Sequence, residues 1–257
     1  MTLTERSNRV AAAIKLQRPA GRRHAARFLA EGPNLVEAAL RRGLVEEVFV
    51  TEEAALRFAD LLTDTTAHLV TDRAAKLLSD TVTPVGLVAV CRQPEVALAD
   101  VLEAPQLVAV AVETSDPGNA GTLIRIADAM GADAFILSGN SVDPYNAKCL
   151  RSSAGSIFSV PVIEVPDTAE LLSKLVSAKL VVLAATLDGE ASLDDVDLTV
   201  PTAWLFGSEA HGLSVADAAA ADVRVTIPMS GGAESLNVAA AAAICLYQSA
   251  AAHRASP

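Results

Sequence analysis

The chain has 257 residues and a formal net charge of −11, and 51% of its residues are hydrophobic while only 4% are aromatic. A chain of this length can bury one large core or two modest ones, which here must be built from aliphatic side chains. No apolar stretch approaches the roughly 20 residues that cross a bilayer, so the sequence argues against a membrane-spanning protein.

In chain order, the first predicted element is a basic segment. Residues 1–30 contain seven arginines and lysines but a single acidic residue, whereas residues 95–257 contain 7 basic and 20 acidic residues. Such a segment is typical of a surface that binds phosphates, although a solvated amphipathic helix would have the same composition. Charge alone leaves both interpretations open.

The rest of the first half alternates between helix and strand patterns. Pro33 stands where the first turn of a helix tolerates proline, and the apolar residues that follow predict a helix to Leu40. Further strands are predicted at Val45–Val50, 68–70 and 87–91, and further helices at 52–62 and 72–79. Residues 87–91 fit an edge strand or a central strand equally well.

The second half has the pattern of a parallel sheet. An apolar strand is predicted at Leu107–Val112, followed by a turn over residues 113–121 and a helix over residues 122–130. Later strands are predicted at residues 134–137, 180–184 and 203–206. We therefore predict an α/β protein with an N-terminal domain at 1–94, a linker at 95–106 and a parallel-sheet domain at 107–257.

Three polar, glycine-containing loops follow predicted strands of the second half, at residues 116–121, 207–214 and 229–237. In a parallel sheet such loops can meet in one crevice. The first loop lacks the glycine spacing of a dinucleotide site and the lysine of a P-loop, which disfavours a dinucleotide-dependent oxidoreductase. Arg125, six residues after Asn119, is the only basic residue between Arg92 and Lys148. On position alone it is either a functional residue or an ordinary surface cation.

The third loop carries Glu234, Ser235 and Asn237 at the start of an alanine-rich helix. Serine or asparagine at that place would be ordinary helix capping. Two glycines, a proline and three polar side chains are more than a cap needs, so we expect this turn also to hold a ligand.

Taken together, the three loops resemble the signature motifs of the SpoU family of RNA ribose 2′-O-methyltransferases. The first matches as Asp116-Pro-Gly-Asn119 with Arg125, the second as residues 205–214, and the third as residues 227–238. Residues 28–33 and 83–86 resemble that family's ribosomal-protein-like substrate-binding domain. The resemblance spans residues 107–247 without a gap and reaches into the first half.

The resemblance implies a C-terminal trefoil knot, a homodimer, an RNA substrate and S-adenosylmethionine as the cofactor. The added N-terminal domain favours ribosomal RNA as the substrate, and the unpaired cysteines favour a cytoplasmic protein. The three cysteines, Cys91, Cys149 and Cys245, show no paired spacing, so we expect reduced thiols and no metal site. The residues whose backbone is expected to cradle the adenosine are Thr186, Gly207, Ile227, Met229 and Leu236.

In the family, the arginine that matches Arg125 activates the ribose hydroxyl and is sometimes described as a general base, and the sequence leaves open whether it accepts the proton. A guanidinium stays protonated in proteins, so we expect Arg125 to clamp the nucleotide and stabilise the developing alkoxide. Asn119, Glu209, Ser235 and Asn237 are expected as orienting partners. The cations expected to contact RNA are Arg18, Arg22, Arg23, Lys148 and Arg151.

One departure from the family pattern lies in the second motif, where Ser208 and Ala210 flank Glu209 in place of asparagine and glycine. We expect these two residues to change the local conformation of the loop and to leave the activity intact. Methylation of transfer RNA, or an RNA-binding assembly factor that has lost activity, remain the alternatives.

Overall fold

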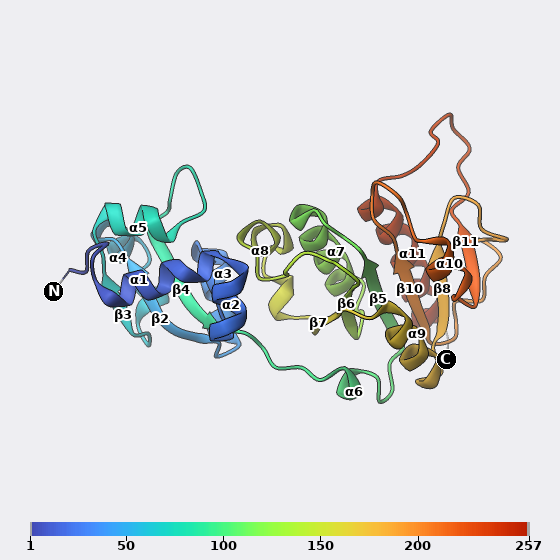
Figure 1. The fold of residues 1–257 in the computed structure, drawn as a ribbon, viewed down its shortest axis with the longest axis horizontal. Coiled ribbons are helices and arrows are strands. Elements are labelled where there is room, and N and C mark those ends of the chain that lie inside the picture. The colour runs from blue at the N-terminus through green and yellow to red at the C-terminus, as the bar shows by residue number, and fades with distance from the viewer. Residues whose placement is uncertain (1, 256–257) are drawn as a thin grey trace. The chain divides into compact units, whose positions relative to one another are not determined.

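The computed structural model describes residues 2–255 (Figure 1). The chain forms two compact units. The first contains the residues up to Glu95 together with Tyr145–Phe158, and the second contains Val96–Pro144 and the chain from Ser159 onward. The predicted α/β class is confirmed, and the second unit is built on a parallel sheet, as predicted.

The first unit contains a four-stranded mixed sheet in the order β1-β4-β2-β3. Its strands are β1 (Arg27–Glu31), β2 (Val45–Val50), β3 (Ala67–Leu69) and β4 (Leu87–Arg92). The β4 strand pairs antiparallel with both β1 and β2, while β2 pairs parallel with β3. Residues 87–91 therefore form a central strand, which explains why all five are buried.

The helices of the first unit cover this sheet. They are α1 (Asn8–Ile14), η1 (Lys15–Gln17), α2 (Pro19–Ala25), α3 (Pro33–Arg41), α4 (Glu52–Arg57), η2 (Ala59–Leu62) and α5 (Asp72–Leu78). The basic N-terminal segment is not a free arm, because α1 and η1 contribute Val10 and Leu16 to a core that also contains Phe49 and Leu78. Its apolar side chains fix it to the domain, and most of its charged side chains, with the exception of Arg22, stay outside the core.

A segment from later in the chain completes the first unit. Tyr145–Phe158 carries α8 (Ala147–Ser153) and η3 (Ser156–Phe158), although it lies in sequence between strands β6 (Ala134–Ser138) and β7 (Val162–Val165) of the second unit. Phe28 of β1 stacks on Tyr145 and Phe158, with ring centroids 4.8 and 5.9 Å apart. Burial of these aromatic rings fixes the segment against β1.

The second unit contains a seven-stranded sheet in the order β7-β6-β5-β10-β8-β11-β9, and every pairing in it is parallel. Its strands are β5 (Leu107–Val112), β6 (Ala134–Ser138), β7 (Val162–Val165), β8 (Val181–Ala185), β9 (Ala191–Ser192), β10 (Thr202–Phe206) and β11 (Val223–Thr226). The sequence order of the strands reverses between β5 and β10. In open α/β sheets such a reversal marks the crevice where ligands bind.

Helices cover both faces of this sheet. They are α6 (Leu98–Val101), α7 (Pro117–Ala129), α9 (Thr168–Ser177), α10 (Val215–Ala219) and α11 (Val238–Ala255). On one face, the leucines of α9 pack on Val110 and Val182. On the other face α11 packs against α7 and β10, and Trp204 Nε1 donates a hydrogen bond of 2.9 Å to Ser249 Oγ.

The α7 helix starts at Pro117, five residues before the predicted start at residue 122. Asp116 caps it by accepting a hydrogen bond of 2.9 Å from the Asn119 N–H, and Pro117 occupies the first helical position. The proline and glycine that suggested a turn are therefore the opening of the helix, where both are tolerated. As a result, Asn119 and Arg125 lie on the same helix.

Candidate active site

The three predicted loops lie at one edge of the parallel sheet. The strands β5, β10, β8 and β11 are consecutive neighbours and parallel, so their carboxyl ends share an edge. The first loop follows β5, the second follows β10 and the third follows β11, and Thr186 comes directly after β8. The structure thus brings together four segments, the first and last of which are more than a hundred residues apart in sequence.

Arg125 is an exposed side chain on α7. The buried residues of that helix, among them Leu123, Ile124 and Ala127, face the protein. The Arg125 guanidinium makes no hydrogen bond or ion pair with another described residue, in contrast to most arginines of the first unit. Asn119 is half-buried one turn and a half earlier on the same helix. Arg125 is therefore free to bind an anion.

The second loop is a tight turn closed by its own backbone. Ser208 N–H donates to Gly212 O at 3.1 Å, and Gly212 N–H donates to Ser208 O at 2.8 Å. A Cβ atom on Gly207 would lie 2.1 Å from the backbone carbon of Gly212, so no other residue fits there. Because Gly207 has no side chain, the backbone of its own loop at Gly212 packs directly against it.

The second and third loops are joined by a direct side-chain contact. Asn237 Nδ2 donates a hydrogen bond of 2.8 Å to Glu209 Oε1. Asn237 Oδ1 meanwhile accepts from the Ala239 N–H at 2.9 Å, so the same residue caps the start of α11. Asn237 therefore caps α11 and also joins the two loops, while its role in orienting the substrate stays a prediction.

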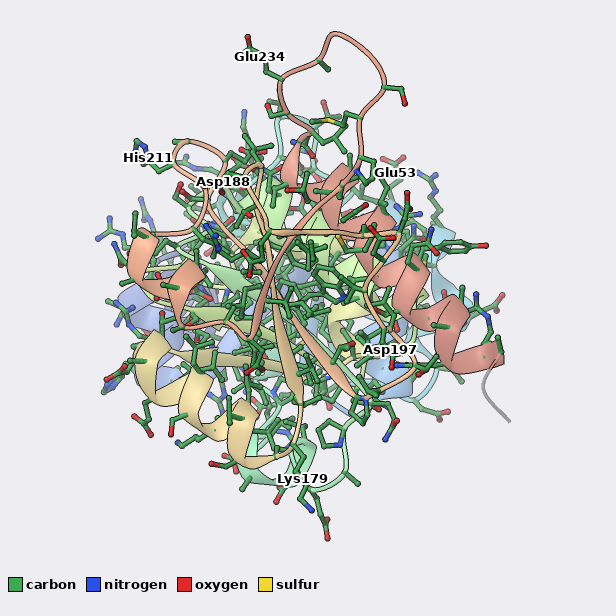
Figure 2. The ribbon with its side chains drawn as sticks, turned by 90° about the vertical axis from the view of Figure 1, so that its right-hand side faces the viewer. Glu53, Lys179, Asp188, Asp197, His211 and Glu234 are labelled. Atoms are coloured by element: carbon green, nitrogen blue, oxygen red, sulfur yellow. The ribbon has the colours of Figure 1, made fainter. Side chains whose placement is uncertain are left out.

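The rest of the third loop is exposed. Figure 2 shows it projecting from the end of the second unit, with Glu234 pointing away from the ribbon. Ser235 is exposed and makes no hydrogen bond to another described residue, so it does not cap α11. Ile227, Met229 and Leu236 likewise form no backbone hydrogen bond within the described chain. Their N–H and C=O groups remain available to a ligand.

The predicted RNA-binding cations fall into two groups. Arg18, Arg23 and Lys148 are exposed. By contrast, Arg22 is 2% exposed and donates to the carbonyls of Leu16 and Gln17 at 3.0 and 2.9 Å. It holds η1 against α2, a structural role that leaves its guanidinium out of reach of RNA.

Arg151 is also engaged by the protein. Its Nη2 lies 3.1 Å from Asp80 Oδ2, in an ion pair within the first unit. The backbone N–H of Asp80 in turn donates to Glu31 Oε2 at 3.2 Å. Arg151 thus holds the loop that follows α5.

Metal and cysteine chemistry find no support in the described residues. No group of three or more histidine, cysteine, aspartate or glutamate side chains among them is arranged to hold a metal ion. The Cys91 and Cys245 thiols are buried, and burial raises the pKa of Cys245 to about 12. Such a thiol stays protonated and is a poor nucleophile. No helix between residues 2 and 255 is long and apolar enough to cross a membrane.

Comparison with known protein families assigns both halves of the chain. Residues 106–247 match the model of the SpoU rRNA Methylase family, and residues 7–89 match that of the MRM3-like substrate binding domain. The chain belongs to the SpoU rRNA methylase family. All three loops of the sheet edge lie within the residues that this SpoU model matches.

Relatives of the SpoU-family chain include 23S rRNA (guanosine(2553)-2′-O)-methyltransferase RlmP of Bacillus subtilis. The two sequences are 36% identical over 221 residues, and the match covers 86% of this chain and 87% of the relative. Among solved structures, the SpoU methyltransferase AviRb from Streptomyces viridochromogenes, in complex with AdoMet, superposes with a TM-score of 0.89 at 29% identity. The match covers 98% of this chain and all of AviRb. An AdoMet-bound rRNA methyltransferase from Sinorhizobium meliloti matches with a TM-score of 0.84 at 28% identity, over 97% of each chain.

The residues of this SpoU-family chain fit a bound S-adenosylmethionine. Unbonded backbone groups at Ile227, Met229 and Leu236 and a buried, unpartnered hydroxyl on Thr186 are polar groups that a nucleoside could satisfy. Sequence reasoning missed Thr226, which bonds the backbone beside Thr186. Its signal was weak, because a threonine at a strand end is ordinary.

Proposed function

We propose that this chain transfers a methyl group from S-adenosylmethionine to a ribose 2′-hydroxyl of 23S rRNA. The observation that carries the proposal is the shared edge of β5, β10, β8 and β11. There a bonded Glu209–Asn237 pair and free backbone groups occur together, and α7, the helix that carries the unpaired Arg125, begins at the same edge. The choice of substrate is supported by the Bacillus and Sinorhizobium relatives, which are both rRNA methyltransferases.

S-adenosylmethionine, when bound, supplies a methyl group on a sulfonium that is already an excellent leaving group. What the chain must add is orientation of the ribose hydroxyl and stabilisation of the charge that develops on its oxygen. Arg125 is suited to this because its guanidinium has no competing partner among the described residues. A guanidinium offers several donors in a fixed plane and no acceptor, so Arg125 acts as a clamp on the developing alkoxide.

The remaining proposed catalytic residues orient the reaction. Glu209 and Asn237 hold the second and third loops together through their 2.8 Å hydrogen bond, and the cap on α11 fixes Asn237 in place. Asn119 on α7 and Ser235 in the exposed loop offer side-chain donors and acceptors to the nucleotide. For the cofactor, we propose the backbones of Gly207, Ile227, Met229 and Leu236 together with Thr186.

For the RNA surface we propose Arg18, Arg23 and Lys148, whose side chains are exposed. We leave out Arg22, which is buried, and Arg151, which a phosphate would have to detach from Asp80. Exposed cations on or beside short helices suit contacts to phosphates, which position an RNA without reading its sequence.

We further propose a cytoplasmic homodimer that pairs through α11. Ile244 and Tyr247 lie one turn apart on that helix, and both are exposed although they are large and apolar. An exposed apolar face on a helix favours association, and we propose that this face packs against the same face of a second copy of the chain. Sedimentation of the wild type as a dimer, and of an Ile244→Glu/Tyr247→Glu variant as a monomer, would support it, whereas a monomeric wild type would contradict it.

The domain boundaries at 1–94, 95–106 and 107–257 and the trefoil knot are also proposals. The position of β10 between β5 and β8, with α11 returning to pack on α7 and β5, is consistent with a threaded chain. Stretching the chain between residues 107 and 255 tests the knot. A knotted chain would reach a shorter extended length than its number of residues allows.

The test of the proposed function is a direct assay. Purified protein is incubated with tritiated S-adenosylmethionine and either 23S rRNA or total transfer RNA, and the RNA is digested to nucleosides. We expect label in a 2′-O-methylated nucleoside from 23S rRNA. Label in transfer RNA alone would favour the transfer-RNA alternative, and no label with either RNA, in a protein that binds the cofactor, would favour an inactive assembly factor.

A further inference from the structure

The turn that follows β10 is stabilised by contacts within the protein. Ser208 and Gly212 exchange two backbone hydrogen bonds, of 3.1 and 2.8 Å, across it. Gly212 has a φ of 66°, in the left-handed region that glycine adopts without steric cost. On the same turn, Glu209 accepts the 2.8 Å hydrogen bond from Asn237, the residue that caps α11. His211 is therefore carried by a turn that is anchored through its backbone and through a neighbouring side chain.

The His211 side chain itself is exposed and has no partner. It makes no hydrogen bond, ion pair or ring contact with any other residue between 2 and 255. Figure 2 shows it at the same end of the second unit as Asp188 and Glu234, outside the ribbon. A histidine ring keeps at least one N–H donor whether it is neutral or protonated. It can thus donate to a ligand at this edge without leaving a partner in the protein.

Most other basic side chains of the second unit are engaged within the protein. The pairs are Lys174 with Glu170, Arg224 with Glu190, His253 with the Val200 carbonyl, and Arg254 with the Tyr247 ring. Lys179 is exposed, but it precedes β8 and so lies at the opposite edge of the sheet, as Figure 2 shows. Apart from Arg125 on α7, His211 is therefore the only basic side chain in the described part of this unit that is unpaired and lies at the edge with the three loops.

The charge of that edge makes such a donor important for an RNA substrate. The loops there carry the exposed carboxylates of Asp188, Glu209 and Glu234. These carboxylates repel phosphates, and the acidic second unit has few cations that offset the repulsion. Phosphate contacts are made by charged and polar donors, and they fix the position of an RNA. An RNA whose ribose enters the site therefore needs a donor at this edge, and His211 is the group available.

We propose that His211 donates a hydrogen bond to a phosphate of the substrate RNA at this edge of the sheet. The inference rests on the proposed function, and it adds a contact from the second unit to the RNA surface proposed on the first. His211 takes no part in the transfer of the methyl group. Its loss weakens binding of the RNA and leaves the chemical step intact.

Methyl transfer to 23S rRNA tests the inference on His211→Ala and on the rescue variant His211→Arg, with Lys179→Ala as the control at the opposite edge. We expect His211→Ala to raise the KM for 23S rRNA about tenfold with kcat nearly unchanged, because a hydrogen bond to a charged group is lost. His211→Arg should bring the KM back to within about twofold of the wild type, since a guanidinium also binds phosphate. Lys179→Ala should match the wild type in both constants.

The salt dependence of binding identifies a phosphate as the contact. In filter binding, the slope of the logarithm of the Kd for 23S rRNA against the logarithm of the salt concentration should be steeper in His211→Arg than in His211→Ala by about 0.7–0.9, the value for one additional phosphate contact. The melting temperature of His211→Ala should stay at the wild-type value, because the side chain has no partner in the free protein.

Three results would overturn the inference and leave the proposed function in place. They are an unchanged KM in His211→Ala, a fall in kcat alone, and equal salt slopes in the two His211 variants. A wild type that transfers no methyl group to 23S rRNA would instead overturn the proposed function, and the inference with it.

Discussion

The two units of the chain differ in where they carry their polar groups. In the second unit, reactive and backbone groups gather at one edge of a parallel sheet, within a segment that is strongly acidic overall. In the first unit, exposed cations lie on short helices at the N-terminus, around a sheet whose central strand is buried. From this difference we propose a division of labour, in which the second unit performs the chemistry and the first provides charge for holding RNA.

Substitution of Arg125 tests the chemical half of this division and should have the largest effect. Loss of a group that stabilises developing charge lowers turnover by about 10²–10³-fold, and we expect Arg125→Ala to lose at least that much. Its affinity for S-adenosylhomocysteine should stay near the wild-type value. Single-turnover kinetics and calorimetry measure the two quantities. Normal turnover by Arg125→Ala would remove Arg125 from the catalytic site.

Asn237 allows capping and orientation to be separated. Serine is as good a helix cap as asparagine but lacks the amide that reaches Glu209, so Asn237→Ser should keep the stability and lose about tenfold in turnover. Asn237→Ala should lose similar turnover and also about 1 kcal/mol in the free energy of unfolding. Thermal denaturation and methyl-transfer assays distinguish them. Wild-type turnover in Asn237→Ser would show that Asn237 is only a cap.

Arg22 gives a contrast within the first unit. Removing its buried guanidinium leaves the carbonyls of Leu16 and Gln17 without their donors, so Arg22→Ala should lower the free energy of unfolding by about 1–3 kcal/mol. Denaturant unfolding measures the loss. An Arg22→Ala protein as stable as the wild type, with weakened RNA binding, would return Arg22 to the RNA surface.

The exposed cations should show the smallest effect, and it should fall on RNA binding. Reversal of charge in Arg18→Glu/Arg23→Glu should raise the KM for RNA and reduce the salt dependence of binding, with kcat and stability nearly unchanged. Filter binding at several salt concentrations provides the measurement. A fall in kcat with unchanged RNA affinity would contradict the division between the units.

Much of the second unit could be predicted because its sequence patterns are local. The apolar run at Leu107–Val112 is a fully buried strand, and polar loops after parallel strands must share an edge. What could not be predicted depends on long-range packing. The aromatic contacts of Phe28 with the segment Tyr145–Phe158 join residues more than a hundred positions apart, and no local pattern marks them.

In the first unit, the positions of single side chains likewise could not be predicted from local sequence patterns. Arg18, Arg22 and Arg23 look alike in sequence, yet Arg22 alone faces inward, because the turn between η1 and α2 directs it at two backbone carbonyls. The strand at Arg27–Glu31 was not predicted either, because the charges at both of its ends obscure the alternation of its apolar residues.

The central claim is tested most directly by mapping ribose methylation in 23S rRNA from cells with and without this protein. Primer extension at limiting nucleotide concentration stops at 2′-O-methylated positions. We predict one stop that is present with the wild-type protein and absent both without it and with Arg125→Ala. Identical stops in all three RNAs would contradict the assignment of this chain as a 23S rRNA ribose methyltransferase.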